Sequence, residues 1–488
     1  MTEYKLLKTL DPITLVEGVA RIIIIVTSGN DIKALYQIME FRGFEKIAVN
    51  RQVEDLPRVV SAICGFCSWS HHLASGKAVD AVFGRKSPLR AELTRILVNY
   101  MQILDSHLLH FSFIGLPDLV LWGEDQRDIV KLLSKNPEIT SLALKTRSLL
   151  KKIESKLMGK IQHGPVVLPG GVCRGFTRED ITEVEKTLVE ISKAVEVLYK
   201  FFDEKIVKSE LFKKLLEREE FTMKCYSMGL VKEGALEFYD GVLRVVDSKG
   251  RVVSETSNPL LYTNIIGEAL TSWSHAILPY YKPAGAKLFS EESAVMVGPL
   301  ARLNVSEKIP GERASEEYKR LIDMAGGKPL SNTVLYHWAR LVEILHSLEM
   351  ISELTRRQEL FEGDVVSFTG KPESRGVGVI EAPRGTLIHD YSVDDNMVVT
   401  RARIITPTTI NNTTINTNLS KASVQLVKEI MSVGNPSPET ITTLESIIRA
   451  YDPCNSCATH CVRLGGRELT TSFSIIVLNE KGEVLWWG

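Results

Sequence analysis

Apolar residues along much of this chain recur at the spacing of an α-helix, with charged residues in the intervening positions. The longest such stretches are residues 89–113, 127–160, 178–223 and 316–360. Short β-branched runs lie between them: residues 19–27 favour a strand, and residues 243–246 and 251–253 flank a turn typical of a β-hairpin. The pattern predicts an α+β fold that is predominantly α-helical, with small β elements.

Breaks in the periodicity indicate where other structure is expected. The Gly-rich segment 368–386 is expected to be irregular, and the Thr/Asn-rich run 406–418 disfavours a helix and predicts a packed loop. A helical pattern recurs at 259–277. A clear helix follows Ser437, its expected N-cap, and runs directly into residues 452–454. No low-complexity linker or internal repeat divides the chain, so one large domain is the economical organisation.

Composition excludes several classes of protein. The chain has 488 residues, 44% of them hydrophobic and 24% charged, as in ordinary globular proteins. Its net charge of −1 favours no polyanionic partner, so nucleic acid is not expected. The apolar run Ile22–Val26 is too short to span a bilayer, and the N-terminus has no signal-peptide core. We therefore expect a cytoplasmic protein without a membrane span.

The most distinctive feature is a pair of Cys-x-x-Cys sequences near opposite ends of the chain. Cys64 and Cys67 form the first, with His71 just downstream, and Cys454 and Cys457 form the second. His460 follows the second pair in the same way. In an intracellular protein such pairs hold metals or perform catalysis more often than they form disulfides. The first pair precedes a helical pattern, and a helix N-terminus favours thiolate over thiol.

The spacing alone leaves the use of these thiolates open. Four thiolates suit a structural zinc ion, and soft thiolates also suit redox metals such as nickel and iron. Structural zinc pairs usually lie ~15–20 residues apart and stabilise small domains, which a chain of this length does not need. Two unrelated thiol pairs are the third alternative. Cys173 and Cys225, outside the pairs, are expected to be small buried hydrophobes.

Several further segments fit one family. The motif Cys-Gly-x-Cys-x-x-x-His at 64–71, with Asp-Pro-Cys-x-x-Cys-x-x-His at 452–460, resembles the large subunit of nickel–iron hydrogenases. Further matches in the same order are Phe41–Glu45, Pro169–Val172, Val297–Asn304 and Glu381–Gly385, the last followed by His389 and Tyr391. Six motifs in order along nearly the whole chain make the resemblance specific. It implies an enzyme that oxidises H₂ reversibly.

The resemblance also implies a role for each cysteine. Cys64 and Cys454 would be terminal thiolates on nickel. Cys67 and Cys457 would bridge nickel to an iron that carries carbon monoxide and cyanide ligands. These metals would polarise H₂ until it splits, with a nearby base taking the proton.

Five other residues gain roles from the same resemblance. Glu17 would be the first carboxylate on the proton exit, and Arg384 would lie over the open face of the metals. Thr408 would hydrogen-bond a cyanide, while Asp452 and His71 would fix the thiolates in place. Taken locally, without the resemblance, Glu17 is a solvated turn carboxylate, Arg384 a surface arginine and Thr408 an ordinary loop residue.

A second metal, magnesium or iron, would lie near the C-terminus in this family. Glu45, His460 and a backbone carbonyl near Ile404 would hold it. The iron–sulfur clusters that receive the electrons would belong only to a partner, the small subunit. The subgroup and the physiological electron acceptor are not identified by these residues.

The end of the chain carries one more expectation. In the family, residues after the final histidine are removed by a maturation protease once nickel-insertion proteins have acted. The resemblance thus implies a mature domain at 1–460, a cut after His460, and an extension at 461–488. Residues 472–478 and 483–487 also have a hairpin pattern, so a permanent strand pair is the alternative. For the whole chain, the alternative function is a non-catalytic or quinone-oxidoreductase-like subunit that shares the fold. Such relatives have generally lost the cysteines that this chain keeps.

Overall fold

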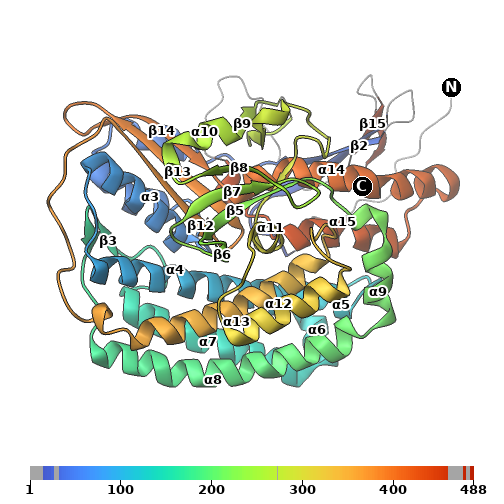
Figure 1. The fold of residues 1–488 in the computed structure, drawn as a ribbon. Helices are drawn as coiled ribbons and strands as arrows, with labels where there is room; N and C mark the ends of the chain where they lie inside the picture. Colours follow the sequence, from blue (N-terminus) through green and yellow to red (C-terminus); the bar gives the residue numbers. More distant parts are fainter. Residues whose placement is uncertain (1–14, 27–31, 272, 460–475, 480–483, 488) are drawn as a thin grey trace.

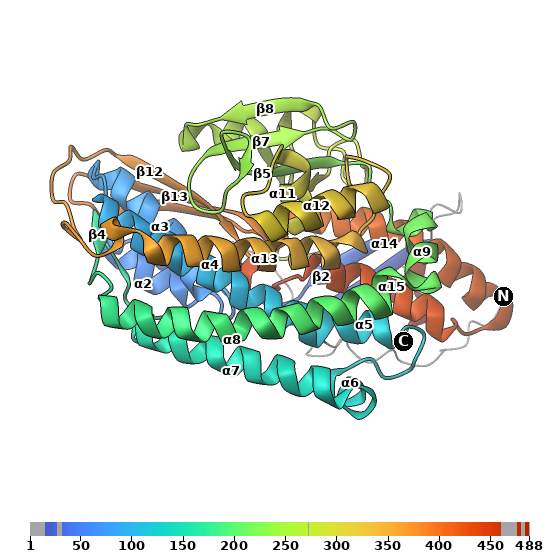
Figure 2. The same cartoon turned by 60° about the horizontal axis from the view of Figure 1, so that its bottom comes forward.

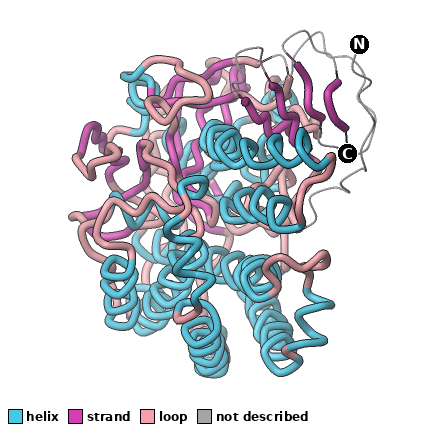
Figure 3. Tube along the Cα trace, turned by 90° about the vertical axis from the view of Figure 1, so that its right-hand side faces the viewer, coloured by secondary structure: helices cyan, strands magenta, loops and turns pink. Residues whose placement is uncertain are grey.

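Helices and strands separate into two sides of the molecule. The computed structural model describes residues 15–26, 32–271, 273–459, 476–479 and 484–487. Long helices line one side, and the strands with several other helices form the other, as Figures 1 and 3 show from two directions. The arrangement confirms the predicted α+β class with its helical majority.

The helical side is built from long amphipathic helices. They are α4 (Leu89–His110), α7 (Pro137–Met158), α8 (Arg178–Phe202), α12 (Glu312–Met324) and α13 (Leu335–Arg356). In α8 the buried residues Ile181, Val184 and Leu188 recur at helical spacing, which is the stripe that the sequence predicts. Helix α13 is buried along most of its length because it packs against α4, α8, α11 (Pro299–Val305) and α12 (Figure 2).

A three-stranded antiparallel sheet supports the first cysteine pair. It consists of β12 (Arg375–Ala382), β13 (Gly385–Val393) and β14 (Val399–Ile405), and α3 (Ser68–Phe83) packs across β12 and β13. Gly376 and Gly378 permit this contact, because a Cβ on either would lie 2.2 Å or less from a carbonyl oxygen of α3. The backbone of α3 therefore lies directly on the sheet.

The remaining strands form smaller sheets. One sheet has the order β11-β5-β7-β8 and contains the predicted hairpin, β7 (Val242–Val246) with β8 (Val252–Thr256). Its other strands are β5 (Tyr226–Lys232), β6 (Ala235–Leu236) and β11 (Val295–Met296). Two-stranded sheets pair β3 (Val167–Leu168) with β4 (Gly171–Val172) and β9 (Ile266–Ala269) with β10 (Leu278–Tyr281).

The two ends of the chain share one sheet. Its order is β16-β15-β1-β2, where β1 (Ala20–Val26) is the predicted N-terminal strand and pairs antiparallel with β2 (Ile32–Ile38). From the C-terminal end, β15 (Ile476–Asn479) pairs parallel with β1 and antiparallel with β16 (Val484–Trp487). The hairpin pattern near the C-terminus is thus confirmed, and the hairpin extends the N-terminal sheet.

Shorter helices and two long ones complete the fold. The shorter ones are α1 (Phe44–Ala48), α2 (Leu56–Ser61), α5 (Leu116–Val120), α6 (Ile129–Lys135), α9 (Glu210–Glu217) and α10 (Tyr262–Ile265). The long ones are α14 (Pro407–Val433) and α15 (Pro438–Tyr451), and α15 begins at Ser437, as predicted. Across the described residues, no helix has both the length and the apolar character needed to cross a membrane.

The loop predicted at 406–418 is wrong, because this run forms the start of α14. Thr406 and Thr409 cap the helix reciprocally, and Pro407 occupies its first turn. The polar side chains are then satisfied by distant backbone: Asn411 accepts from the N–H of Val297 at 2.9 Å, and Asn416 accepts from Tyr36 at 2.6 Å. Tertiary hydrogen bonds outweigh the weak helix propensity of threonine and asparagine.

Two other local predictions also need correction. The helical pattern at 259–277 yields only the short α10 and otherwise includes strand β9, which pairs with β10. The segment 368–386, expected to be irregular, contains strand β12 and the start of β13. Both strands are buried on both faces, so they lack the alternation that would have identified them.

Thr406→Ala is expected to lower the free energy of unfolding by about 1 kcal/mol, because it removes the side-chain cap of α14. Urea denaturation followed by circular dichroism measures the change. Thr182→Ala is the matched control, since that hydroxyl is exposed and bonds only the Arg178 carbonyl of its own helix. Equal shifts in the two variants would contradict the capping role.

Candidate metal centre

The two cysteine pairs meet inside the protein. The sulfur atoms of Cys64, Cys67, Cys454 and Cys457 all lie within 4.8 Å of one another, and all four residues are buried. The Sγ atoms of Cys67 and Cys457 are 3.2 Å apart, and those of Cys64 and Cys454 are 3.3 Å apart. Two sulfurs that share a metal ion at about 2.3 Å cannot be more than about 4.6 Å apart, and these pairs satisfy that limit.

Local structure aims each pair at the cluster. Cys67 is the N-cap of α3, which confirms the placement predicted for the first pair, and the Phe66 N–H donates to Cys64 Sγ at 3.3 Å. The second pair follows α15, where Asp452 adopts a left-handed conformation with φ of 53°. The Cys454 N–H donates to Thr408 Oγ1 at 2.9 Å.

The electrostatics of the cluster call for a cation. Burial raises the pKa of Cys454 and of Cys457 well above the usual value for a thiol, whereas hydrogen bonds from Cys454, Cys457 and Cys67 lower the pKa of Cys64. Four neighbouring thiols in this buried space cannot all ionise to thiolates unless a cation offsets their negative charges. Divalent metal ions of soft character would stabilise all four, so the donor set fits a thiolate-bound metal centre.

Glu17 lies against the second pair. Its Oε2 accepts hydrogen bonds from Cys454 Sγ at 3.0 Å and from the Ser456 N–H at 3.1 Å, while its Oε1 accepts from the Ser456 hydroxyl. Burial, and next the charge of Cys64, raise the pKa of Glu17. The local interpretation as a solvated turn carboxylate is therefore wrong. A carboxyl with a raised pKa can both take and release a proton near neutral pH.

Arg384 is only 7% exposed, so the local interpretation as a surface residue is wrong for it as well. Its Nε donates to the carbonyl of Asp452 at 2.7 Å and its Nη2 to Asp452 Oδ1 at 3.1 Å. Within the described part of the chain, Arg384 Nη1 and Asp452 Oδ2 are buried without a hydrogen-bond partner. The negative charges of Asp452 and then of Cys454 and Cys67 raise the pKa of Arg384 despite its burial.

Arg302, from the motif at 297–304, fixes the turn that carries Arg384. Its guanidinium donates to the carbonyls of Ala382 and Pro383 at 2.9 and 3.1 Å. It also forms buried ion pairs with Glu381 and Glu343, at 2.9 and 2.6 Å. Although burial opposes it, Arg302 lowers the pKa of Glu343 to about 2.

Two glycines allow that turn to pack closely. A Cβ on Gly298 would lie 2.8 Å from the carbonyl oxygen of Arg384, and a Cβ on Gly385 would lie 2.6 Å from the nitrogen of Gly298. Both glycines have positive φ, which side chains disfavour.

His71 lies behind the first pair in a row of hydrogen-bonded side chains. Its Nδ1 is 3.1 Å from His389 Nε2, and His389 Nδ1 is 2.6 Å from the hydroxyl of Tyr391. That hydroxyl donates to Ser75 at 2.9 Å. Burial lowers the pKa of His71 to about 4, so the imidazole is neutral at physiological pH. His389 and Tyr391, which follow the motif at 381–385, thus connect α3 to the sheet.

The structure brings together part of the expected second metal site. Glu45 Oε1 accepts a hydrogen bond from the N–H of Ile404 at 2.8 Å, and Arg403 lies 3.5 Å from Oε2. The backbone nitrogens of Arg42 and Gly43 donate to the Thr459 carbonyl at 3.1 and 3.0 Å, which holds the C-terminal segment beside α1. His460 lies outside the described residues.

The sequence did not identify Ser456, Tyr36 or Arg302 as parts of this site. Ser456 stands inside the second Cys-x-x-Cys spacing, which could have drawn attention to it. Tyr36 donates to Asn455 Oδ1 at 2.9 Å, but nothing in strand β2 distinguishes it from a core residue. Of the two described cysteines outside the pairs, Cys225 is buried as predicted, whereas Cys173 is exposed and the prediction for it is wrong.

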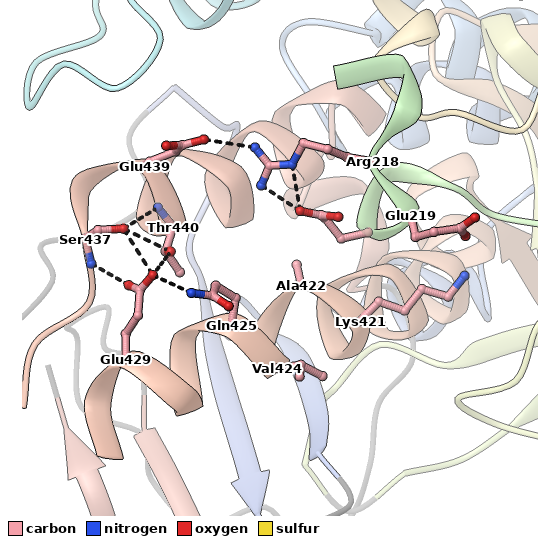
Figure 4. Close-up of a pocket in the computed structure, with 11 residues that line it drawn as sticks. Arg218, Glu219, Lys421, Ala422, Val424, Gln425, Glu429, Ser437, Glu439 and Thr440 are labelled. Atoms are coloured by element: carbon pink, nitrogen blue, oxygen red, sulfur yellow. Dashed lines mark hydrogen bonds and ion pairs between the residues drawn. The ribbon is translucent and has the colours of Figure 1, made fainter. Parts of the chain in front are cut away.

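A surface pocket of about 710 Å³ lies elsewhere, between residues 218–220, helix α14 and the start of α15 (Figure 4). Arg218 forms an ion pair with Glu439, and Glu429 accepts hydrogen bonds from the N–H of Ser437, the N-cap residue of α15, and from the Thr440 hydroxyl. None of the residues assigned to the metal centre lines it. Four buried thiols with an adjacent carboxyl, and not this pocket, define the chain as a thiolate-ligated metalloprotein.

Comparison with known proteins identifies the family of metalloproteins to which the chain belongs. A family model described as nickel-dependent hydrogenase matches residues 42–167 and 272–460. An F420-non-reducing hydrogenase of Archaeoglobus profundus has an iron–sulfur subunit that is 33% identical over 485 residues, 98% of each chain. The beta subunit of the NAD-reducing hydrogenase HoxS of Cupriavidus necator is 30% identical over 478 residues, 93% of this chain and 94% of the relative.

Solved structures of the same family have the same fold. An NAD⁺-reducing NiFe-hydrogenase in its H₂-reduced state matches with a TM-score of 0.85 at 31% identity, over 93% of this chain and 100% of that chain. The Ni-Fe-Se hydrogenase of D. vulgaris Hildenborough shares the fold with a TM-score of 0.68 at 22% identity, over 93% and 99% of the two chains. This chain belongs to the nickel-dependent hydrogenase family, and the four clustered cysteines fit its catalytic large subunit.

Cys454→Ser is expected to remove most bound nickel and iron, because the hydroxyl is a poor substitute for a soft thiolate. Metal analysis of the purified protein measures this loss. Cys225→Ser is the control: Cys225 is equally buried but lies outside the cluster, so it should retain the metals. Full metal content in the Cys454 variant would contradict the assignment.

Proposed function

We propose that this chain catalyses the reversible conversion of H₂ into two protons and two electrons at a nickel–iron centre. The observation that carries the proposal is the contact between Glu17 and Cys454: an ionisable carboxyl is hydrogen-bonded to one of four clustered thiols. When bound, a nickel–iron centre polarises H₂ and accepts its electrons. The residues of the chain hold that centre, order its surroundings and move the proton.

Each cysteine takes a distinct part in this proposal. Cys64 and Cys454 would be terminal ligands of nickel, and Cys67 and Cys457 would be the ligands shared between nickel and iron. The Cys67 and Cys457 sulfurs, 3.2 Å apart, are close enough to bind the same metal ion, as are those of Cys64 and Cys454 at 3.3 Å. Both pairs lie in a buried setting from which water is excluded, which strengthens their bonds to metal ions.

Arg384 would lie over the open face of the metals near the cyanide ligands, and Thr408 would donate a hydrogen bond to a cyanide. Arg384 has a buried Nη1 with no partner in the described chain, while its other nitrogens are held by Asp452. Thr408 uses its oxygen to accept from Cys454, which leaves its hydroxyl hydrogen for another acceptor. Asp452 holds Arg384 through two hydrogen bonds, and His71 is hydrogen-bonded to His389.

Protons leave through Glu17. Its Oε2 receives the Cys454 hydrogen, and Ser456 bonds the other oxygen, so the carboxyl is oriented for transfer in both directions. Electrons leave through a partner. Beyond the four cysteines, no group of metal-ligating side chains occurs in the described residues that could hold an iron–sulfur cluster. We therefore propose that the partner is an iron–sulfur small subunit, and we separately propose that the location is the cytoplasm.

A second metal, magnesium or iron, binds at Glu45 with the carbonyl of Ile404 and with His460. The approach of Thr459 to residues 42 and 43 supports this site. We also propose that nickel-insertion proteins load the centre and that a protease then removes residues 461–488. The family match ends at residue 460, which supports that boundary. Strands β15 and β16 would leave the N-terminal sheet at this step.

Infrared spectroscopy tests the proposed centre. Protein matured with its own accessory proteins should show metal-bound carbonyl and cyanide stretches, and the Cys454→Ser variant should lack them. Spectra without these bands, or elemental analysis that finds zinc and no nickel, would overturn the proposal. A non-catalytic subunit would show the fold without the bands and without H₂ oxidation.

Glu17→Gln is expected to slow H₂ oxidation by about 10²–10⁴-fold, because the amide cannot carry the proton. The carbonyl and cyanide bands should remain, since the cysteines are untouched. Glu17→Asp is the comparison variant, which keeps an ionisable carboxyl and should retain more activity than Gln. Unchanged turnover in the Gln variant would exclude Glu17 from the proton route.

A further inference from the structure

The helix that leads into the second cysteine pair has one backbone hydrogen bond at its C-cap. At the end of α15 the Asp452 N–H donates to the carbonyl of Arg449 at 3.0 Å, as in a standard helix end. The next residue is Pro453, which has no N–H to donate. Several of the last carbonyls of α15 must therefore find other donors.

Buried side chains from distant elements bond three carbonyls of this turn, one of which, that of Arg449, also accepts the Asp452 N–H. His110, at the end of α4, lies 2.7 Å through its Nε2 from the Arg449 carbonyl. Arg340, in the middle of α13, donates from Nη2 to the Ala450 carbonyl at 2.8 Å. Arg384 donates to the Asp452 carbonyl at 2.7 Å, so three side-chain donors hold the carbonyls of residues 449, 450 and 452 just before Cys454.

We propose that His110 and Arg340 are positioning residues for the metal centre, which fix the C-terminal turn of α15 and thereby aim Cys454 and Cys457. Both side chains are 1% exposed. Because a carbonyl only accepts hydrogen bonds, Nε2 of His110 carries the hydrogen. The proposal rests on the metal centre proposed above, but the clamp consists of contacts between protein groups alone, so it can be tested in metal-free protein.

The surroundings hold both donors rigidly. A π-helical turn, Phe111–Gly115, follows His110 directly, and such turns redirect a helix and often occur at functional sites. His110 stacks on His337 with ring centroids 5.6 Å apart and an interplanar angle of 18°. A Cβ at Gly115 would lie 2.7 Å from His337 Nδ1, so that stack is tightly confined.

Arg340 also contributes charge. In the described chain its Nε and Nη1 are buried without hydrogen-bond partners, and its guanidinium lies over the ring of Tyr336 at 5.6 Å. Its positive charge acts on Asp452, the partner of Arg384, and attracts the carboxylate. Positive charges from Arg340 and Arg384 thus offset the negative end of the α15 dipole and the charge of the thiolates.

His110→Leu and Arg340→Met test this inference in the full-length protein. Amide hydrogen exchange of residues 446–459 in metal-free protein should accelerate by about tenfold, the effect of losing one hydrogen bond. After maturation, bound nickel should fall by about tenfold or more, and the carbonyl and cyanide bands should shift. His110→Gln and Arg340→Lys, which keep a donor, should show smaller changes of the same kind.

The control is His346→Leu, because His346 is also buried and bonds a backbone carbonyl, that of Pro310, at 2.9 Å. It should leave exchange at 446–459 and the infrared bands unchanged. The proposal is overturned if the control matches the test variants, or if exchange and bands are unchanged in either His110→Leu or Arg340→Met. Should either variant fail to fold, its donor-keeping counterpart must show the smaller effect, or the proposal is again overturned. Wild-type protein without the infrared bands would instead refute the nickel–iron centre, while the exchange result would still decide the clamp.

Discussion

Four thiols in a water-excluded space impose the constraint on which this structure depends. They cannot ionise together without cations, and they lie closer to one another than uncoordinated sulfurs prefer. Holding them there requires the two ends of the chain to meet, and the contacts between Glu17 and residues 454–456 close that junction. A metal centre at this junction would therefore stabilise the fold as well as perform the chemistry.

The scaffold around the cluster is a set of backbone carbonyls held by buried cations and imidazoles. Arg302 holds the turn before Arg384, and Arg384 holds Asp452. His110 and Arg340 hold the end of α15. Such donors are costly to bury, and each is stabilised by carboxylates, carbonyls or aromatic faces nearby. The desolvation cost of burying these donors is offset by their function, because the turns that carry Arg384 and Asp452 must be fixed for the four cysteines to keep their positions.

Local patterns predicted the elements that depend on local forces. The N-terminus of α3 at Cys67, the start of α15 at Ser437, and the hairpin β7–β8 all follow from caps, periodicity and turn residues. The helix α14 was missed because its threonines and asparagines bond to strands and loops far away in sequence. Strand β12 was missed because both of its faces are buried, and Cys173 is exposed although an isolated cysteine is usually buried.

The sequence by itself determined the ligand types, their pairing as two Cys-x-x-Cys motifs, and the family to which these motifs belong. Residue chemistry and short spacings are properties of the chain itself, so they can be read from the sequence without a structure. Only the tertiary structure decided that Glu17 contacts Cys454, that Arg384 is buried against Asp452, and that α4 and α13 reach the end of α15. Those contacts join residues 68 to 437 positions apart, and burial and partner choice there depend on packing that no local pattern encodes.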